Sequence, residues 1–141
     1  MSNITCLRLK LRPDLNFTVI VNPNSGPGDG TGPDKQYTVA VTELSSYPNA
    51  QTVGYVRTGY ATRNITDVID EVNIYSGWSS ISSSLTMHGI FFDEAPHEYT
   101  ADAVDFMHTV NKAVKDATGL QGPKTVRLCP YDFIFPLLTM A

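Results

Sequence analysis

The sequence predicts an α/β fold of the (β/α)8 TIM-barrel type, with roughly the N-terminal half of a barrel in this chain. Two observations lead to this prediction. Short apolar, β-branched runs alternate with longer segments whose apolar residues recur at helical spacing. The runs begin at Phe17, Thr52 and Met87, at equal intervals of about 35 residues, close to the length of one βα unit in such a barrel. Alternating strands and helices imply parallel strands joined by right-handed crossovers.

The first two βα units follow directly from these patterns. A strand at 17–21 precedes a loop rich in Gly and Pro, and then a helix whose apolar stripe starts at Tyr37 and stops at Pro48. A second strand at 52–56 leads into a helix that Asn64 is expected to cap.

A third βα unit and a fourth strand complete the regular part of the chain. The apolar run at 87–92 is typical of a buried strand. Thr100 begins a capped amphipathic helix, and Gly119 is placed to end it. The fourth strand is predicted at 124–128.

We expect one domain at 15–128, because 141 residues suffice for one hydrophobic core and not for two. The segment 1–14 is expected to be irregular, although part of it is compatible with a strand. The tail 129–141 is apolar and interrupted by prolines, and it fits neither the helical nor the strand period where a further loop and helix are due.

Composition excludes several classes of function. The formal net charge is −4 and the basic residues are scattered, so a nucleic-acid partner is not expected. No apolar run reaches the length of a membrane span, so a membrane partner is not expected either. Cys6 and Cys129 lack metal-ligand spacing, and the loop 22–28 lacks the phosphate-binding pattern, so we expect no metal and no cofactor. The start of the chain has no signal-peptide pattern; taken literally, it is not exported.

Two adjacent carboxylates, Asp93 and Glu94, directly follow the apolar run 87–92. Ligands in α/β folds bind at the carboxyl ends of parallel strands, so this position predicts an active site. The simpler alternative is that the two acids cap the loop or the following helix. Adjacent residues at a strand end point to different sides, so we expect only one of them to face a substrate. Glu94, with the longer side chain, is the preferred candidate.

Six polar or aromatic residues follow the first two strands and are expected on the same rim as a substrate-binding set. They are Asn22, Asn24, Tyr55, Arg57, Tyr60 and Arg63. Amides and hydroxyls bond to sugar hydroxyls, and aromatic faces stack on sugar rings. The alternatives are turn chemistry for the two asparagines, core packing for Tyr55 and an ion pair with Asp67 for Arg63. Tyr60 is the preferred aromatic contact, whereas His97 is more simply a solvated loop histidine.

Three segments, each at the end of a predicted strand, carry a further signal. They are Val21-Asn22-Pro23-Asn24-Ser25-Gly26-Pro27-Gly28, Gly54-Tyr55-Val56-Arg57-Thr58-Gly59-Tyr60-Ala61-Thr62-Arg63 and Gly89-Ile90-Phe91-Phe92-Asp93-Glu94. In this order and spacing they resemble the spherulin-4 family, which is grouped with glycoside hydrolase family 135 and is found widely in fungi. The resemblance covers roughly residues 15–126.

This resemblance implies a (β/α)8 barrel and a secreted, extracellular hydrolase. Its implied substrate is a cell-wall polysaccharide of α-1,4-linked galactosamine or N-acetylgalactosamine, which the enzyme cleaves at internal bonds. By the matching motif, Asp93 and Glu94 correspond to the family's essential acids. The family's further glutamate on a later strand, its signal peptide, its first strand and the second half of its barrel are expected outside these residues. The chain is therefore expected to be an incomplete form.

Two other hypotheses stand beside the hydrolase. A half barrel that keeps the rim without the chemistry would be a non-catalytic carbohydrate-binding or structural protein. The other hypothesis is an artefactual gene product with no stable fold, because an open half barrel exposes edge strands at 17–21 and 124–128 and leaves the inner face of its sheet uncovered. It therefore predicts a homodimer through the barrel edges, aggregation or partial unfolding.

Overall fold

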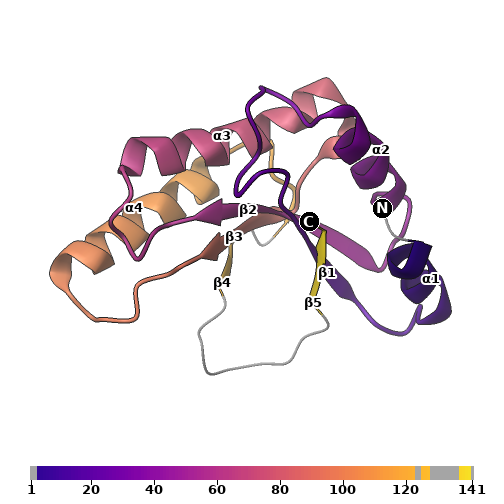
Figure 1. Ribbon diagram of the computed structural model, residues 1–141, viewed down its shortest axis with the longest axis horizontal. Helices are drawn as coiled ribbons and strands as arrows, with labels where there is room; N and C mark the ends of the chain where they lie inside the picture. Colours follow the sequence, from indigo (N-terminus) through magenta and orange to yellow (C-terminus); the bar gives the residue numbers. More distant parts are fainter. Residues whose placement is uncertain (1–2, 123–124, 128–136, 141) are drawn as a thin grey trace.

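Five parallel strands form one sheet in the computed structural model of the chain (Figure 1), which describes residues 3–122, 125–127 and 137–140, with only the backbone described outside 7–122. The strands are β1 (Phe17–Val21), β2 (Ala50–Arg57), β3 (Gly89–Asp93), β4 (Thr125–Arg127) and β5 (Leu137–Met140). The helices are α1 (Asn3–Leu11), α2 (Lys35–Leu44), α3 (Ile65–Ile81) and α4 (Ala101–Asp116), with a short 3-10 helix η1 (Ser83–Leu85). The strand order is β4-β3-β2-β1-β5.

The predicted alternation of strands and helices is confirmed. The strands β1, β2, β3 and β4 are neighbours in chain order, and α2, α3 and α4 connect them. Asn64 caps α3 and Thr100 caps α4, each accepting a hydrogen bond from a backbone N–H of the first turn (2.9 and 3.2 Å). The boundaries of β2 and β3 differ from the prediction by one or two residues: β2 begins at Ala50 and ends at Arg57, and β3 begins at Gly89 and ends at Asp93.

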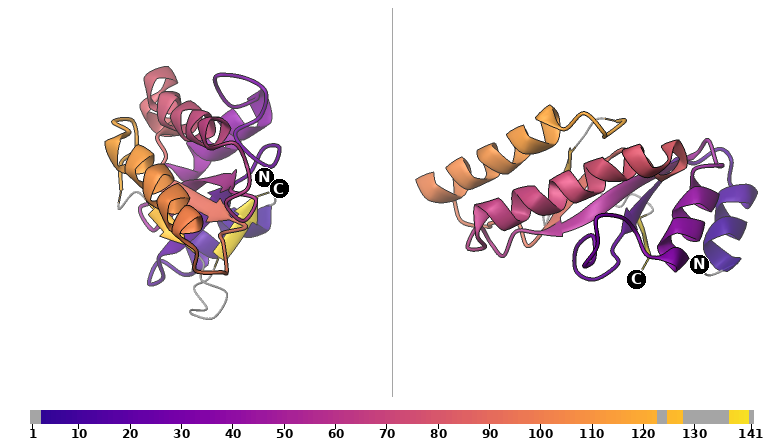
Figure 2. Two further views of the ribbon diagram at one scale, coloured as in Figure 1. Left: turned by 90° about the vertical axis from the view of Figure 1, so that its left-hand side faces the viewer. Right: turned by 90° about the horizontal axis from the view of Figure 1, so that it is seen from above.

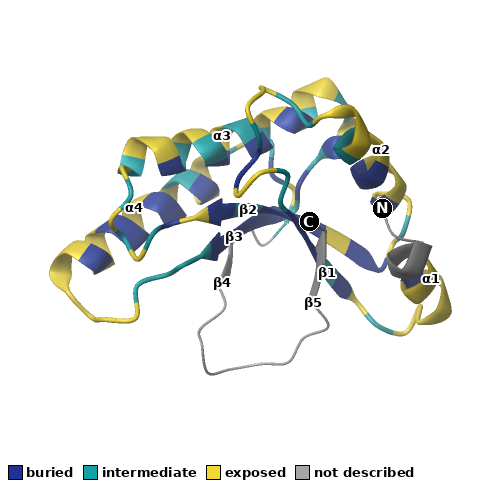
Figure 3. Ribbon diagram, viewed as in Figure 1, coloured by how far each residue is buried: buried dark blue, intermediate teal, exposed yellow. Residues whose placement is uncertain are grey.

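The helices α2, α3 and α4 cover one face of the sheet, as the two views of Figure 2 show. Strand residues on this face, among them Val21, Val56 and Phe92, pack with Tyr75 and Trp78 of α3 in the main core. In Figure 3 the buried residues are dark blue, and they make up most of β2 and β3 and one side of α3 and α4. Burying each such side chain stabilises the fold by about 1.5–3 kcal/mol. Among the helices in the described ranges, none has the length and apolar character needed to cross a membrane.

The opposite, helix-free face of the sheet carries a second apolar cluster. Ile20, Val53 and Phe91 form it, one from each of three adjacent strands, and Tyr55 packs partly against them. These three side chains are 2%, 2% and 6% exposed. The expectation that the inner face of the sheet is uncovered is therefore wrong at these positions.

The N-terminal segment is a helix, α1, and not the irregular segment expected at 1–14. Leu9 on this helix is 1% exposed and packs with Phe17 and Leu44. The buried amide of Asn49 donates to the backbone carbonyls of Leu9, Arg12 and Leu15 (3.1–3.2 Å), which ties the end of α1 to β2. The sequence missed this helix because its apolar residues do not recur on one helical face.

The tail expected to fit neither period contains a strand, β5, which pairs in parallel with β1, Thr18 opposite Leu137. The prediction that 17–21 is an edge is consequently wrong, because β1 lies inside the sheet. Within the described part of the chain the outer strands are β4 and β5. Positions 124 and 128 of the predicted fourth strand lie outside the described residues.

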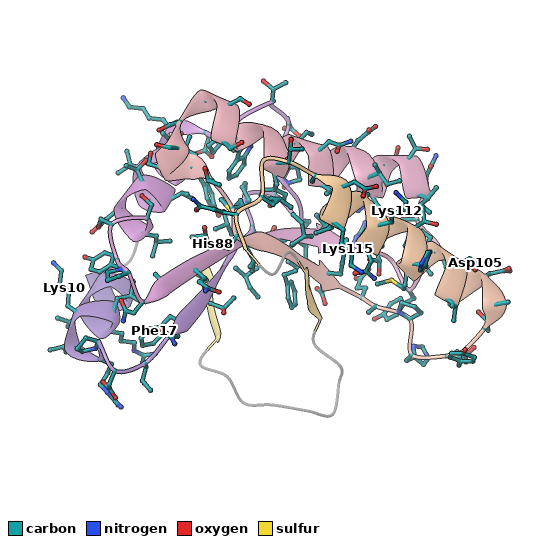
Figure 4. The ribbon with its side chains drawn as sticks, turned by 180° about the vertical axis from the view of Figure 1, so that it is seen from behind. Lys10, Phe17, His88, Asp105, Lys112 and Lys115 are labelled. Atoms are coloured by element: carbon teal, nitrogen blue, oxygen red, sulfur yellow. The ribbon has the colours of Figure 1, made fainter. Side chains whose placement is uncertain are left out.

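At the amino edge of the sheet, His88 forms hydrogen bonds through its side chain and its backbone. His88, labelled in Figure 4, precedes β3, and its Nδ1 accepts a hydrogen bond from the N–H of Thr52 (3.2 Å). Burial lowers the pKa of His88, so that the imidazole stays neutral and keeps this acceptor. The N–H of Gly122 donates to the carbonyl of His88 (2.9 Å). His88 thus extends the pairing of β2 with β3 toward the amino edge.

Gly54 and Gly77 offer a test of this packing. A Cβ on Gly54 would lie 2.6 Å from the ring of Tyr75, which is fully buried and bonded through its hydroxyl to the Val21 carbonyl (2.9 Å). We expect Gly54→Ala to lower the free energy of unfolding by about 1–3 kcal/mol, because the ring cannot move away. A Cβ on Gly77, within α3, meets nothing within 4 Å. Gly77→Ala is expected to raise the free energy of unfolding by up to about 1 kcal/mol.

Urea unfolding of the wild type and of both variants measures these changes. Equal unfolding midpoints for Gly54→Ala and Gly77→Ala would contradict the packing described.

Candidate functional site

The two acids lie at the carboxyl edge of the sheet, where β2 and β3 end. Asp93 is the last residue of β3 and pairs in register with Arg57, the last residue of β2. Successive strand side chains alternate between the two faces, and Phe92 packs under the helices while Phe91 belongs to the opposite cluster. Asp93 therefore shares the helix-free face with Phe91, and Arg57 shares it with Tyr55.

The carboxylate of Asp93 is fixed by two hydrogen bonds. The Tyr55 hydroxyl donates to Oδ2 at 2.6 Å, and the backbone N–H of Glu94 donates to Oδ1 at 2.8 Å. Burial, together with the bond to Asp93, raises the pKa of Tyr55 far above that of a free phenol, so the hydroxyl keeps its proton. Tyr55, for which core packing was the alternative, is bonded directly to a predicted acid.

Glu94 leaves the strand in a left-handed backbone conformation, with φ +52°. A residue with a side chain adopts this conformation at a cost and keeps it where neighbours hold it. Its carbonyl oxygen accepts hydrogen bonds from the Thr58 hydroxyl (2.6 Å) and from the N–H of Tyr60 (2.7 Å). Its carboxylate lies 3.7 Å from Nε of Arg57, and its side chain is 30% exposed. Glu94 is thus partly exposed and lies beside a cationic side chain.

Thr58 connects β2 to both acids and was not singled out from the sequence. It is fully buried. Its N–H donates to the carbonyl of Asp93 (2.9 Å), and its hydroxyl lies 3.1 Å from that oxygen and 2.6 Å from the carbonyl oxygen of Glu94. Its position in the sequence could have identified it: Thr58 follows Arg57, and aligning the two predicted strands sets it opposite Glu94.

Tyr60 stands at the rim of the site, as its sequence position predicts. Its side chain is 56% exposed, and its ring lies edge-on to that of His97, with 5.8 Å between ring centroids and an angle of 85°. Tyr60 and Ala61 both have positive φ, +56° and +66°. The backbone of this strained turn is bonded to the carbonyl of Glu94, and the exposed ring of Tyr60 stands beside His97.

Arg63 has a structural partner. It forms a bidentate ion pair with Glu71 of α3 (2.7 and 3.2 Å) and donates to the carbonyl of Arg57 (2.6 Å). The hydrogen bond to Glu71 raises the pKa of Arg63. The alternative partner considered from the sequence, Asp67, is therefore not the residue that forms the ion pair. Glu71 lies one helical turn further on the same face of α3, which is the signal that would have identified it.

The loop after β1 is held by turn chemistry, the alternative proposed for its asparagines. Oδ1 of Asn22 accepts a hydrogen bond from the N–H of Gly26 (3.2 Å), and its carbonyl accepts one from the Tyr37 hydroxyl (2.9 Å). Asn24 is exposed. A Cβ on Gly26 would lie 3.3 Å from the carboxyl carbon of Glu71, so this loop borders the Arg63–Glu71 pair and reaches the acids through it. The structure thus brings Tyr55, Arg57 and Tyr60 to the acids directly, and the asparagines only indirectly.

Comparisons with known proteins agree with the motifs. The sequence profile of the spherulation-specific family 4 matches residues 6–131. Spherulin-4 of Physarum polycephalum is 34% identical over 105 residues, which are 74% of this chain and 29% of that protein. The crystal structure of Aspergillus clavatus Sph3 in complex with GalNAc superposes with a TM-score of 0.81 at 40% sequence identity, covering 88% of this chain and 51% of that one. The chain thus spans about half of one relative and less than a third of the other. It belongs to the spherulation-specific family 4, the spherulin-4 family.

Proposed function

We propose that the chain carries the acid-bearing part of the active site of a secreted glycoside hydrolase. The observation that carries this proposal is the fixed pair Asp93 and Glu94 at the carboxyl end of β3, with Tyr55 bonded to the first and Arg57 beside the second. The solved relative is a complex with GalNAc, which supports an amino sugar as the unit that is recognised. The family resemblance supports an α-1,4-linked galactosamine or N-acetylgalactosamine polysaccharide, cut within the chain, as the extracellular substrate.

The two acids have different roles in this proposal. Glycoside hydrolysis builds up positive charge on the sugar between two carboxyl groups. Asp93, whose carboxylate is oriented by hydrogen bonds from Tyr55 and from the N–H of Glu94, supplies negative charge beside that sugar. Glu94 is the carboxyl that reaches the glycosidic bond, because its longer side chain is partly exposed. The carboxyl group on the other side of the sugar comes from a glutamate on a later strand of the family fold.

The fold supports the view that this sheet is part of a (β/α)8 barrel wall. β1 to β4 are neighbours in chain order, and their connecting helices lie on one face, as in such a barrel. The helix-free face then lines the interior, and Asp93, Tyr55 and Arg57 stand at its C-terminal mouth. The chain covers 51% of the solved relative. The rest of the barrel, and hydrolysis by a complete barrel, are therefore part of the proposal.

Neutralising either acid tests the assignment. We expect Asp93→Asn and Glu94→Gln each to lower the rate of oligosaccharide release from α-1,4-linked N-acetylgalactosamine polymer by roughly 10²–10⁴-fold, because each removes a charge or a proton-transfer group at the reacting bond. Glu98→Gln removes one negative charge from an exposed position of the same loop and serves as the control.

Retention of full activity in both acid variants would contradict the assignment. A wild-type chain that binds the polymer without cleaving it, with binding unchanged in both variants, would instead support the non-catalytic carbohydrate-binding protein.

The aromatic contact is tested by binding of GalNAc. We expect Tyr60→Ala to weaken binding roughly 3- to 10-fold, because the exposed ring stacks on the sugar. Tyr60→Phe should bind as the wild type does if stacking is the contact. Tyr99→Ala removes a ring that is 94% exposed on the neighbouring loop and is the matched control. Calorimetry on the three variants measures the effect, and equal affinities for Tyr60→Ala and the wild type would refute a Tyr60 contact.

We also propose that the chain forms a homodimer through its outer strands. β4 and β5 are the two ends of the described sheet, and each leaves one side without a strand partner there. Light scattering after gel filtration should give about twice the chain mass of 15.5 kDa, and the value should fall on dilution. A mass of one chain at all concentrations would exclude the dimer.

A further inference from the structure

We infer that Thr58 is a positioning residue of the acidic site, whose hydroxyl holds the backbone between Asp93 and Glu94 and so aims the carboxylate of Glu94. The inference deepens the proposed function and rests on it. Thr58 touches neither a carboxylate nor, in the proposal, the sugar; it acts only through the main chain of the two acids.

The geometry gives Thr58 a clamp across the strand pair. Its N–H donates to the Asp93 carbonyl at 2.9 Å and thereby continues the β2–β3 pairing one step beyond its last pair. Its hydroxyl has a single proton and lies nearer to the Glu94 carbonyl (2.6 Å) than to that of Asp93 (3.1 Å). The backbone N–H and the side-chain hydroxyl of one residue therefore bind two successive carbonyl groups.

The clamp acts at the point where the chain leaves the strand. Glu94 has φ +52°, a conformation that costs free energy for a residue with a Cβ and persists where the surroundings fix it. Two donors hold its carbonyl, the Thr58 hydroxyl and the N–H of Tyr60. Without the hydroxyl, Tyr60 alone would hold it, and Tyr60 is itself in a strained turn with φ +56°.

The direction of the Glu94 side chain follows from this backbone conformation. An extended residue after Asp93 would place its side chain on the helix-covered face, because strand side chains alternate. The turn at Glu94 instead brings its carboxylate to 3.7 Å from Nε of Arg57, a residue on the helix-free face. The hydroxyl of Thr58 therefore helps to place both acids on the same side of the sheet.

The chemistry at this position points to threonine. The residue is fully buried, so a hydroxyl there needs partners inside the protein, and it has two carbonyl oxygens within reach. Valine has the same shape without the donor, and serine keeps the donor without the methyl group. Thr62, four residues on, offers a matched control: its hydroxyl also donates to a backbone carbonyl, that of Gly59 (2.6 Å), in an exposed position of the same loop.

The experiment compares Thr58→Val, Thr58→Ser and Thr62→Val in two measurements on the full chain. The first is hydrogen exchange of the backbone amides of Tyr60 and Glu94, followed by NMR. The second is kcat and KM for hydrolysis of α-1,4-linked N-acetylgalactosamine polymer. We expect Thr58→Val to speed exchange of both amides about tenfold or more and to lower kcat roughly 100-fold, with KM changed far less, because a misplaced carboxylate affects the reacting geometry more than binding.

Thr58→Ser should restore both properties to near the wild-type values, and Thr62→Val should leave them unchanged. Faster exchange in Thr58→Val with unaltered kcat would show a merely structural residue and overturn the inference, as would unaltered exchange. A wild-type chain without hydrolytic activity would contradict the proposed function and not the clamp, which the exchange rates of Tyr60 and Glu94 then decide alone.

Discussion

The register between β2 and β3 is the constraint on which the site depends. It sets Arg57 opposite Asp93 and brings Tyr55, two residues earlier, within 2.6 Å of the Asp93 carboxylate. A slip of one residue would turn Asp93 to the helix-covered face and set Phe92 on the other, because strand side chains have a period of two. The burial of Phe92 and Ile90 under the helices therefore fixes the position of the acid as firmly as any contact within the site does. The same strand register therefore determines both the packing of the core and the geometry of the site.

Backbone strain is concentrated where the strands open into loops. The non-glycine residues with positive φ in the described chain are Ser25, Tyr60, Ala61 and Glu94, each in a loop after a strand, and two of them are bonded to one another. Such conformations cost about 1–3 kcal/mol each and need support from rigid neighbours. The buried Thr58 provides it for Glu94. The non-glycine residues with positive φ in the described chain thus lie outside the helices and strands, and three of them lie at the rim that carries the acids.

The sequence predicted what depends on local pattern and missed what depends on distant partners. The strand positions, the helix caps at Asn64 and Thr100 and the place of the two acids follow from periodicity and from single residues. The pairing of β5 with β1 joins segments that no local period connects. The role of Thr58 likewise appears only when two strands are aligned. α1 was missed because Asn49 and Leu9, rather than an amphipathic stripe, hold it.

The occupied oxygens of Asp93 limit how an active site can be completed. Its Oδ2 and Oδ1 accept hydrogen bonds from Tyr55 and from the N–H of Glu94, which hold the carboxylate in one orientation. α3 and α4 pack against the other face of β2 and β3, and the apolar floor of Ile20, Val53 and Phe91 lies behind the acids toward the amino edge. Among the described residues, the side of the acids that neither these helices nor this floor covers is the carboxyl edge on the helix-free face. In the proposed hydrolase, a carboxyl group opposite Glu94 would come from an element on that side, which is where the opposite wall of a closed (β/α)8 barrel would stand.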